Sequence, residues 1–119
     1  MVRLYTILVA EDDPELREII AATLAEPGYA VLTASDGYEA VRILAENWVN
    51  LLITDIKMPG MDGFDLARQA KVMRPHIQII YLSGYSPDSV KSIGPIYGKV
   101  LKKPFRMSDL LAEVSGHLS

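Results

Sequence analysis

Short apolar runs alternate five times with longer segments in which apolar residues recur every three or four positions. Runs rich in Val, Ile, Leu and Ala, with few polar interruptions, are typical of strands buried on both faces of a parallel sheet. The longer segments have the spacing of amphipathic helices, and Pro, Gly, Ser or Asp stand at their boundaries. The pattern predicts strands at residues 5–10, 30–34, 51–54, 77–82 and 100–101.

The segments between these strands carry recognisable helix boundaries. Asp13 is expected to cap a helix whose first position is Pro14, and residues 36–39 have the form of a capping box at the start of the second helix. A third helix is predicted at residues 63–73, and a fourth is expected to have Ser86 as its cap and Pro87 as its first position, and to stop at Gly94 and Pro95. The side chains expected to face the core from the second and last helices are Ala40, Val41, Leu44, Trp48, Leu110, Leu111, Val114 and Leu118.

Five alternations of strand and helix predict an α/β fold, a doubly wound parallel sheet with helices on both faces. At 119 residues the chain is long enough for one hydrophobic core and too short for two, so we expect a single domain over residues 1–119. Right-handed crossovers with one reversal of strand order place the first, third, fourth and fifth strands side by side. Their carboxyl ends then meet at one edge, where open α/β sheets bind ligands.

The residues at these four strand ends are polar and chemically complementary. Glu11 and Asp12 follow the first strand, Asp55 the third, Ser83 the fourth and Lys103 the fifth. Each has an ordinary structural explanation, because acids at helix starts can stay solvated, serines bond nearby backbone and lysines flank strands. Their coincidence at one edge of the sheet instead favours a functional site.

Three carboxylates facing one lysine are short of positive charge, which favours a divalent cation among them. Oxygen ligands without histidine or cysteine select a hard ion such as Mg²⁺. Because Mg²⁺ commonly bridges carboxylates and phosphate oxygens, the predicted chemistry is phosphoryl transfer with Asp55 as the nucleophile. Lys103 would contribute a point charge to the phosphoryl group, and the Ser83 hydroxyl would donate a hydrogen bond to it.

The composition limits which kinds of partner the protein can bind and which cellular compartment it can occupy. The net charge of −3 and the lack of a basic stripe argue against direct binding of nucleic acid. The chain has no cysteine, which excludes disulfides and thiolate metal sites and permits a reducing compartment. The first apolar run is too short, and too soon followed by acids, to be a signal peptide or a membrane span. We therefore expect a soluble, cytoplasmic protein that does not bind membranes.

Four stretches, ILVAEDDP, LLITDIKMPGMDG, YLSGY and VLKKPF, occur in this order, and the resemblance that they carry extends over essentially the whole chain. In combination they resemble the receiver domain of two-component response regulators. The resemblance implies a flavodoxin-like fold with five helices and a five-stranded sheet in the order 2-1-3-4-5. It also implies phosphorylation on aspartate by a sensor histidine kinase or a histidine phosphotransfer protein. Such a domain is a signalling module, and it promotes only its own phosphorylation and dephosphorylation.

The resemblance assigns roles to the residues at the sheet edge. Asp55 matches the phosphoacceptor, and Glu11 and Asp12 match the acidic pair that binds Mg²⁺. The backbone carbonyl of Lys57 matches a further metal ligand, so the implied metal set is Glu11, Asp12, Asp55 and Lys57.

Ser83 and Lys103 match the remaining conserved positions of the family, the switch hydroxyl and the lysine that contacts the phosphoryl group. The bond between Lys103 and Pro104 is implied to be cis. The chain departs from the family at Val100, where an aromatic residue often swings inward on activation. We expect Ser83 to pull the following loop and repack the face made by the fourth helix, fifth strand and fifth helix, which is also a possible dimer surface.

Other functions remain open at this point. A receiver-like docking module would work without phosphorylation, and a Mg²⁺ phosphatase would need an acid where Lys57 stands. Flavin binding would need glycines and hydroxyls after the first strand, where this chain has acids. No output domain follows the predicted receiver, so we expect either a stand-alone regulator or a part of a larger regulator or hybrid kinase. The sequence names neither the kinase nor the downstream target.

Overall fold

The computed structural model describes residues 4–93 and 96–118, and its described part contains one five-stranded parallel sheet. The strand order β2-β1-β3-β4-β5 is the order implied by the family resemblance. Residues 94–95, where the fourth helix was expected to stop, lie outside the described residues. The strands are β1 (Thr6–Ala10), β2 (Ala30–Ala34), β3 (Leu51–Asp55), β4 (Gln78–Ser83) and β5 (Lys99–Lys102).

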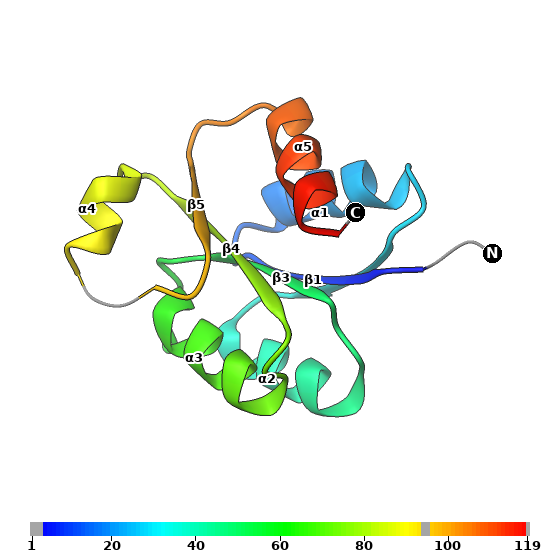
Figure 1. Ribbon diagram of the computed structural model, residues 1–119, viewed down its shortest axis with the longest axis horizontal. Helices are drawn as coiled ribbons and strands as arrows, with labels where there is room; N and C mark the ends of the chain where they lie inside the picture. Colours follow the sequence, from blue (N-terminus) through cyan, green and yellow to red (C-terminus); the bar gives the residue numbers. More distant parts are fainter. Residues whose placement is uncertain (1–3, 94–95, 119) are drawn as a thin grey trace.

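Helices cover both faces of this sheet (Figure 1). Those on one face are α1 (Pro14–Ala25) and α5 (Met107–Leu118), and those on the other are α2 (Gly37–Glu46) and α3 (Gly63–Met73). The short helix α4 (Pro87–Lys91) lies beside the edge strand β5. Among the described residues, no helix has the length and apolar character needed to cross a bilayer.

Side chains alternate between two hydrophobic clusters, because successive residues of a strand point to opposite faces of the sheet. On β1, Ile7 and Val9 pack on the α1 and α5 side, while Leu8 and Ala10 pack on the α2 and α3 side. Strand β3 is buried along its whole length. The central strands are therefore fixed from both sides, and so are the polar residues at their carboxyl ends.

Helix capping follows the sequence pattern. The side chain of Asp13 accepts a hydrogen bond from the backbone N–H of Glu15 at 3.0 Å, which confirms it as the cap of α1. Asp36 accepts from the N–H of Glu39 at 2.8 Å, and the Glu39 carboxylate accepts from the N–H of Ser35. The predicted capping box is therefore confirmed, with the returning bond one residue earlier than usual.

One predicted core residue is wrong. Trp48 was expected to face inward from the second helix, but it is 64% exposed. Helix α2 ends at Glu46, and its C-cap Asn47 is extended, so Trp48 lies beyond the helix and off its buried stripe. Its ring instead lies 5.7 Å from the guanidinium of Arg74, a cation–π arrangement at the surface.

Candidate functional site

The carboxyl ends of β1, β3 and β5 bring one lysine and two carboxylates into direct contact. The ammonium of Lys103 donates to Glu11 Oε1 and to Asp55 Oδ2, both at 3.1 Å. Glu11 is 1% exposed and Asp55 is 9% exposed, so both carboxylates are largely removed from water. The sequence prediction that Lys103 reaches the acids across the sheet edge is confirmed.

Asp12 completes an acidic cluster with these two carboxylates. One carboxylate oxygen from each of Glu11, Asp12 and Asp55 lies within 4.8 Å of the others. Asp12 is exposed, which leaves the cluster open to solvent on one side. Oxygen ligands grouped in this way fit a hard cation such as Mg²⁺, which keeps several waters and needs only a few protein carboxylates. The predicted convergence of the acids is therefore confirmed, and the donor set suits the predicted ion.

Burial sets the protonation of this cluster. The pKa of Glu11 is raised from 4.5 to about 7, chiefly by desolvation and also by the Asp55 charge, against the N–H of Asp13 and the contact with Lys103, which lower it. Burial alone would lower the pKa of Lys103, but the hydrogen bond to Asp55 and the charges of both acids outweigh it and raise the pKa. The lysine thus stays charged and holds the two acids together.

The raised pKa of Glu11 predicts a stability change with pH. The folded protein binds this proton more tightly than the unfolded chain does, so the contribution is complete below about pH 4.5 and is lost as pH rises through about 7. With a chelator present, we expect the free energy of unfolding to fall over this range by an amount on the order of 2 kcal/mol. Urea denaturation at several pH values measures this change.

The matched control for the pH effect is Glu11→Gln, because an amide resembles the protonated carboxyl and does not titrate. The difference in unfolding free energy between the two proteins isolates Glu11 from the other titrating groups. That difference is expected to move in favour of Glu11→Gln as pH rises from about 4.5 to about 7. A difference that is constant with pH would contradict the assignment.

Ser83 lies beside Asp55 in a cavity of about 300 Å³. Its side chain is buried, and its Oγ accepts a hydrogen bond from the N–H of Tyr85 at 2.9 Å. The remaining walls come from the loop after β3, from the start of the segment after β4 and from Lys103. The exposed Lys57 extends over the ring of Tyr85, with Nζ 5.9 Å from the ring centroid. The cavity therefore places a carboxylate, a hydroxyl and an ammonium around one space.

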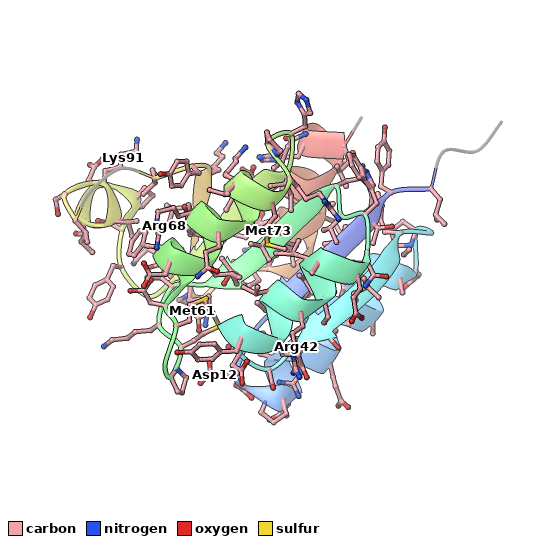
Figure 2. The ribbon with its side chains drawn as sticks, turned by 90° about the horizontal axis from the view of Figure 1, so that it is seen from below. Asp12, Arg42, Met61, Arg68, Met73 and Lys91 are labelled. Atoms are coloured by element: carbon pink, nitrogen blue, oxygen red, sulfur yellow. The ribbon has the colours of Figure 1, made fainter. Side chains whose placement is uncertain are left out.

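The loop between Asp55 and α3 is held by a close backbone approach. The N–H of Gly63 donates to the carbonyl of Ile56 at 2.8 Å. A Cβ atom at position 63 would lie 2.3 Å from the carbonyl oxygen of Asp55, so only glycine fits there. Figure 2 shows Met61 of this loop and Asp12 on the same, lower side of the view. The glycine thus fixes the exit of the chain from the site.

Sequence reasoning missed one residue that supports the acidic pair. Arg17, on the second turn of α1, donates from Nη1 to the backbone carbonyl of Glu11 at 2.9 Å. The signal in the sequence was a basic residue shortly after three consecutive acids. The contact holds the backbone between β1 and α1, from which Glu11 and Asp12 extend.

Two further features of the last strand concern the bond before Pro104 and the side chain of Val100. The bond between Lys103 and Pro104 is cis, as the resemblance implied. Val100 is buried in the cluster on the α2 and α3 side, where the family often has an aromatic residue. The roles in phosphoryl transfer and metal binding that the resemblance assigned stay predictions at this point. They concern Asp55, Ser83, Lys57 and Lys103.

Comparison with known proteins is consistent with this geometry. The model of the family described as "Response regulator receiver domain" matches residues 7–115. The response regulator receiver protein CpdR of Brucella abortus (strain 2308) is 39% identical over 110 residues, which cover 91% of this chain and 92% of that protein. The chain spans half or less of the length of other curated relatives, for example 48% of the response regulator MprA of Mycobacterium sp. (strain KMS) and 12% of the sensor kinase CckA of Brucella abortus (strain 2308).

Solved structures of response regulator proteins have the same fold as this chain. A response regulator receiver protein from Sinorhizobium medicae WSM419 superposes with a TM-score of 0.88 at 31% identity, covering 99% of this chain and 97% of that one. The response regulator protein TrrA from Thermotoga maritima, solved in complex with Mg(2+)-BeF, gives 0.82 at 30% identity, covering 95% and 98%. The sheet order, the acidic cluster and these similarities agree, and the chain belongs to the response regulator receiver domain family.

Proposed function

We propose that Asp55 accepts a phosphoryl group from a phosphohistidine of a sensor histidine kinase or a histidine phosphotransfer protein. The observation that carries this proposal is the contact of the Asp55 carboxylate with Lys103, inside a cavity that Ser83 also lines. Receiver domains of this family act as signalling modules, so the phosphorylated aspartate is the signal. Beyond its own phosphorylation and dephosphorylation, we assign no catalysis to the chain.

In the proposed transfer, a carboxylate oxygen of Asp55 forms a bond to phosphorus while the bond from phosphorus to the histidine nitrogen breaks. The electron pair of that bond leaves with the imidazole. Lys103, already within 3.1 Å of Asp55 Oδ2, neutralises negative charge on the phosphoryl oxygens. The Ser83 hydroxyl donates a hydrogen bond to one of these oxygens, and a turn of its side chain toward them would lengthen the bond that its Oγ accepts from the N–H of Tyr85. Positioning and charge neutralisation by these side chains constitute most of the catalysis.

Glu11, Asp12 and Asp55 would hold a Mg²⁺ ion, together with the backbone carbonyl of Lys57. When bound, the ion supplies positive charge that lowers the repulsion between the carboxylates and the phosphoryl oxygens. Support for this ligand set comes from the carboxylate oxygens within 4.8 Å of one another. The similarity to TrrA, solved in complex with Mg(2+)-BeF, is consistent with it.

We also propose that phosphorylation changes partner binding through the face made by α4, β5 and α5. Dimerisation through the same face is a further possibility, and the downstream target is a protein of unknown identity. The proposed setting is the cytoplasm, which the absence of cysteine permits. A stand-alone regulator and a receiver within a larger regulator or hybrid kinase are both compatible with a family that includes CpdR and the sensor kinase CckA.

The direct test is incubation of the protein with acetyl phosphate, with and without Mg²⁺, followed by intact mass measurement. We expect one added phosphoryl group that requires Mg²⁺ and is absent in Asp55→Asn, because the amide is not a nucleophile. Asp65→Asn is the matched control, since Asp65 is an exposed acid on α3 outside the site. An unmodified wild-type protein would favour a docking module, and modification that persists in Asp55→Asn would show a different acceptor.

A further inference from the structure

The segment that connects β4 to β5 is tied to the sheet at both ends by side chains of one strand. At its start, Ser83 Oγ accepts a hydrogen bond from the N–H of Tyr85 at 2.9 Å. Near its end, the hydroxyl oxygen of Tyr81 accepts one from the N–H of Tyr97 at 3.1 Å. Tyr81 and Ser83 are two residues apart on β4, so both point to the same face of the sheet. One strand therefore holds both ends of the segment that contains α4.

Tyr81 of β4 lies beside Val100, the position on β5 at which the aromatic residue implied by the family resemblance is missing. Its backbone pairs in register with Val100 of β5, and both side chains belong to the cluster on the α2 and α3 side. The Tyr81 ring is 0% exposed and packs against Phe64 of α3, with ring centroids 5.7 Å apart. The Tyr81 ring thus packs in the same buried cluster as Val100. An inward swing of an aromatic side chain from β5 has no counterpart in this chain.

Helix α4 itself is held by few core contacts. It has only five residues, and Val90 is its one buried side chain. Tyr85 before it and Ile93 and Tyr97 after it are exposed by 55%, 65% and 42%. A short helix with little buried apolar surface has a low local stability, so its position is easily shifted by single contacts. The two hydrogen bonds from β4 therefore act on this segment together with the packing of Val90 and Ile96 against the core.

Burial keeps the Tyr81 hydroxyl neutral while it accepts the hydrogen bond from the N–H of Tyr97. Desolvation raises the pKa of Tyr81 above its ordinary value of 10.0, against the N–H of Tyr97, which lowers it. The group stays neutral at physiological pH and accepts the backbone hydrogen bond without carrying a charge into the core.

We propose that Tyr81 is the positioning residue of the switch, because its hydroxyl holds the segment before β5 in the arrangement of the unphosphorylated protein. This inference rests on the proposed function, since it concerns how a phosphoryl group on Asp55 reaches the α4, β5 and α5 face. When Ser83 turns toward the phosphoryl group it releases Tyr85, and the segment then depends on the bond between Tyr81 and Tyr97. Activation breaks that second bond, and the face moves.

If the hydrogen bond between Tyr81 and Tyr97 belongs to the switch, it is thermodynamically linked to binding of a phosphoryl group at Asp55, whereas a purely structural hydrogen bond is not. A contact made only in the unphosphorylated arrangement opposes binding of a phosphoryl group, and its removal strengthens such binding. Tyr81→Phe deletes the hydroxyl and keeps the ring and its packing against Phe64. If the lost hydrogen bond is worth about 1 kcal/mol, the affinity for a phosphoryl mimic is expected to rise about fivefold. A merely structural hydroxyl would leave that affinity unchanged or weaken it.

The test is titration of the Mg²⁺-loaded protein with beryllofluoride, followed by amide chemical shifts. In Tyr81→Phe we expect about fivefold tighter binding. We also expect amides of residues 97–102 to move part of the way toward their beryllofluoride-bound positions before any beryllofluoride is added. The matched control is Tyr29→Phe, because Tyr29 is a partly buried tyrosine packed in the cluster on the opposite face of the sheet. It is expected to change neither quantity.

Each result has a distinct meaning. Unchanged or weaker beryllofluoride binding in Tyr81→Phe overturns the inference. So does a shift of residues 97–102 that is the same in Tyr29→Phe. In both cases the proposed function stands, provided that amides around Asp55 in the wild-type protein respond to beryllofluoride. A wild-type protein without any response around Asp55 contradicts the proposed function itself, and the inference fails with it.

Discussion

Gly63→Ala is expected to lower the free energy of unfolding by about 3 kcal/mol and to reduce phosphorylation of Asp55 strongly. The new Cβ would lie 2.3 Å from the Asp55 carbonyl oxygen and 2.8 Å from Cα of Ile56. Both are backbone atoms, so no side chain can rotate away, and β3 or the loop must move. Because the loop begins at Asp55, the proposed phosphoacceptor, the displacement reaches the site itself. Urea denaturation and labelling with acetyl phosphate measure the two effects.

The control for this substitution is Gly116→Ala. Gly116 is an exposed residue of α5, and a Cβ atom added there would meet no other atom within 4 Å. Alanine also favours helices more than glycine does. We expect that variant to be more stable than wild type by about 0.5 to 1 kcal/mol, with unchanged phosphorylation. Equal stability of Gly63→Ala and wild type would show that the loop has more freedom than the close contact implies.

Lys103→Met is expected to destabilise the protein by about 2 kcal/mol when no divalent cation is present. The substitution keeps the length of the aliphatic chain and removes the ammonium that joins Glu11 and Asp55. Two buried carboxylates then repel each other, and Glu11 is expected to take up a proton at a pH above the wild-type value of about 7. The estimate lies below that for a fully buried pair, because the Lys103 side chain is 29% exposed.

Mg²⁺ distinguishes this electrostatic effect from lost packing. An ion held by the carboxylates replaces the missing charge, so saturating Mg²⁺ is expected to restore most of the lost stability. The affinity for Mg²⁺ is expected to rise, because Lys103 no longer competes for the same oxygens. Lys99→Met is the matched control. Lys99 is exposed and pairs with the partly buried Glu113, and the loss of this ion pair is expected to change stability by less than about 1 kcal/mol at any Mg²⁺ concentration. A loss in Lys103→Met that Mg²⁺ does not reduce would contradict the account.

Much of the site was predictable because its residues lie where an apolar run in the sequence gives way to polar or chain-breaking residues. Buried strands end where a charge or a chain-breaking residue appears, so Asp55, Ser83 and Lys103 mark strand ends in the sequence. Parallel strands with right-handed crossovers bring those ends to one edge, whatever the details of packing. The convergence of the acids with Lys103 followed from these two rules, and the structure confirms it.

The wrong prediction for Trp48 and the missed contacts have a common origin. Helical spacing places Trp48 on the inward stripe only if α2 continues to it, and the helix ends at Glu46. The residue at which a helix ends depends both on the helix propensity of the local sequence and on the path that the loop must take to reach the next strand. Arg17 and Tyr81 make their contacts across segments, and no local pattern shows which carbonyl or N–H a long side chain will meet.

The amino-acid sequence by itself determined which segments form strands and helices, that the sheet is parallel and which residues meet at its carboxyl edge. These depend on periodicity, on chain breakers and on the handedness of crossovers, all of which are local or general. Only the tertiary structure decided the raised pKa of Glu11, the glycine requirement beside Asp55 and the position of Tyr81 against Val100. Each of these depends on how closely groups from distant segments approach and how much water they exclude, and those distances exist only in the folded chain.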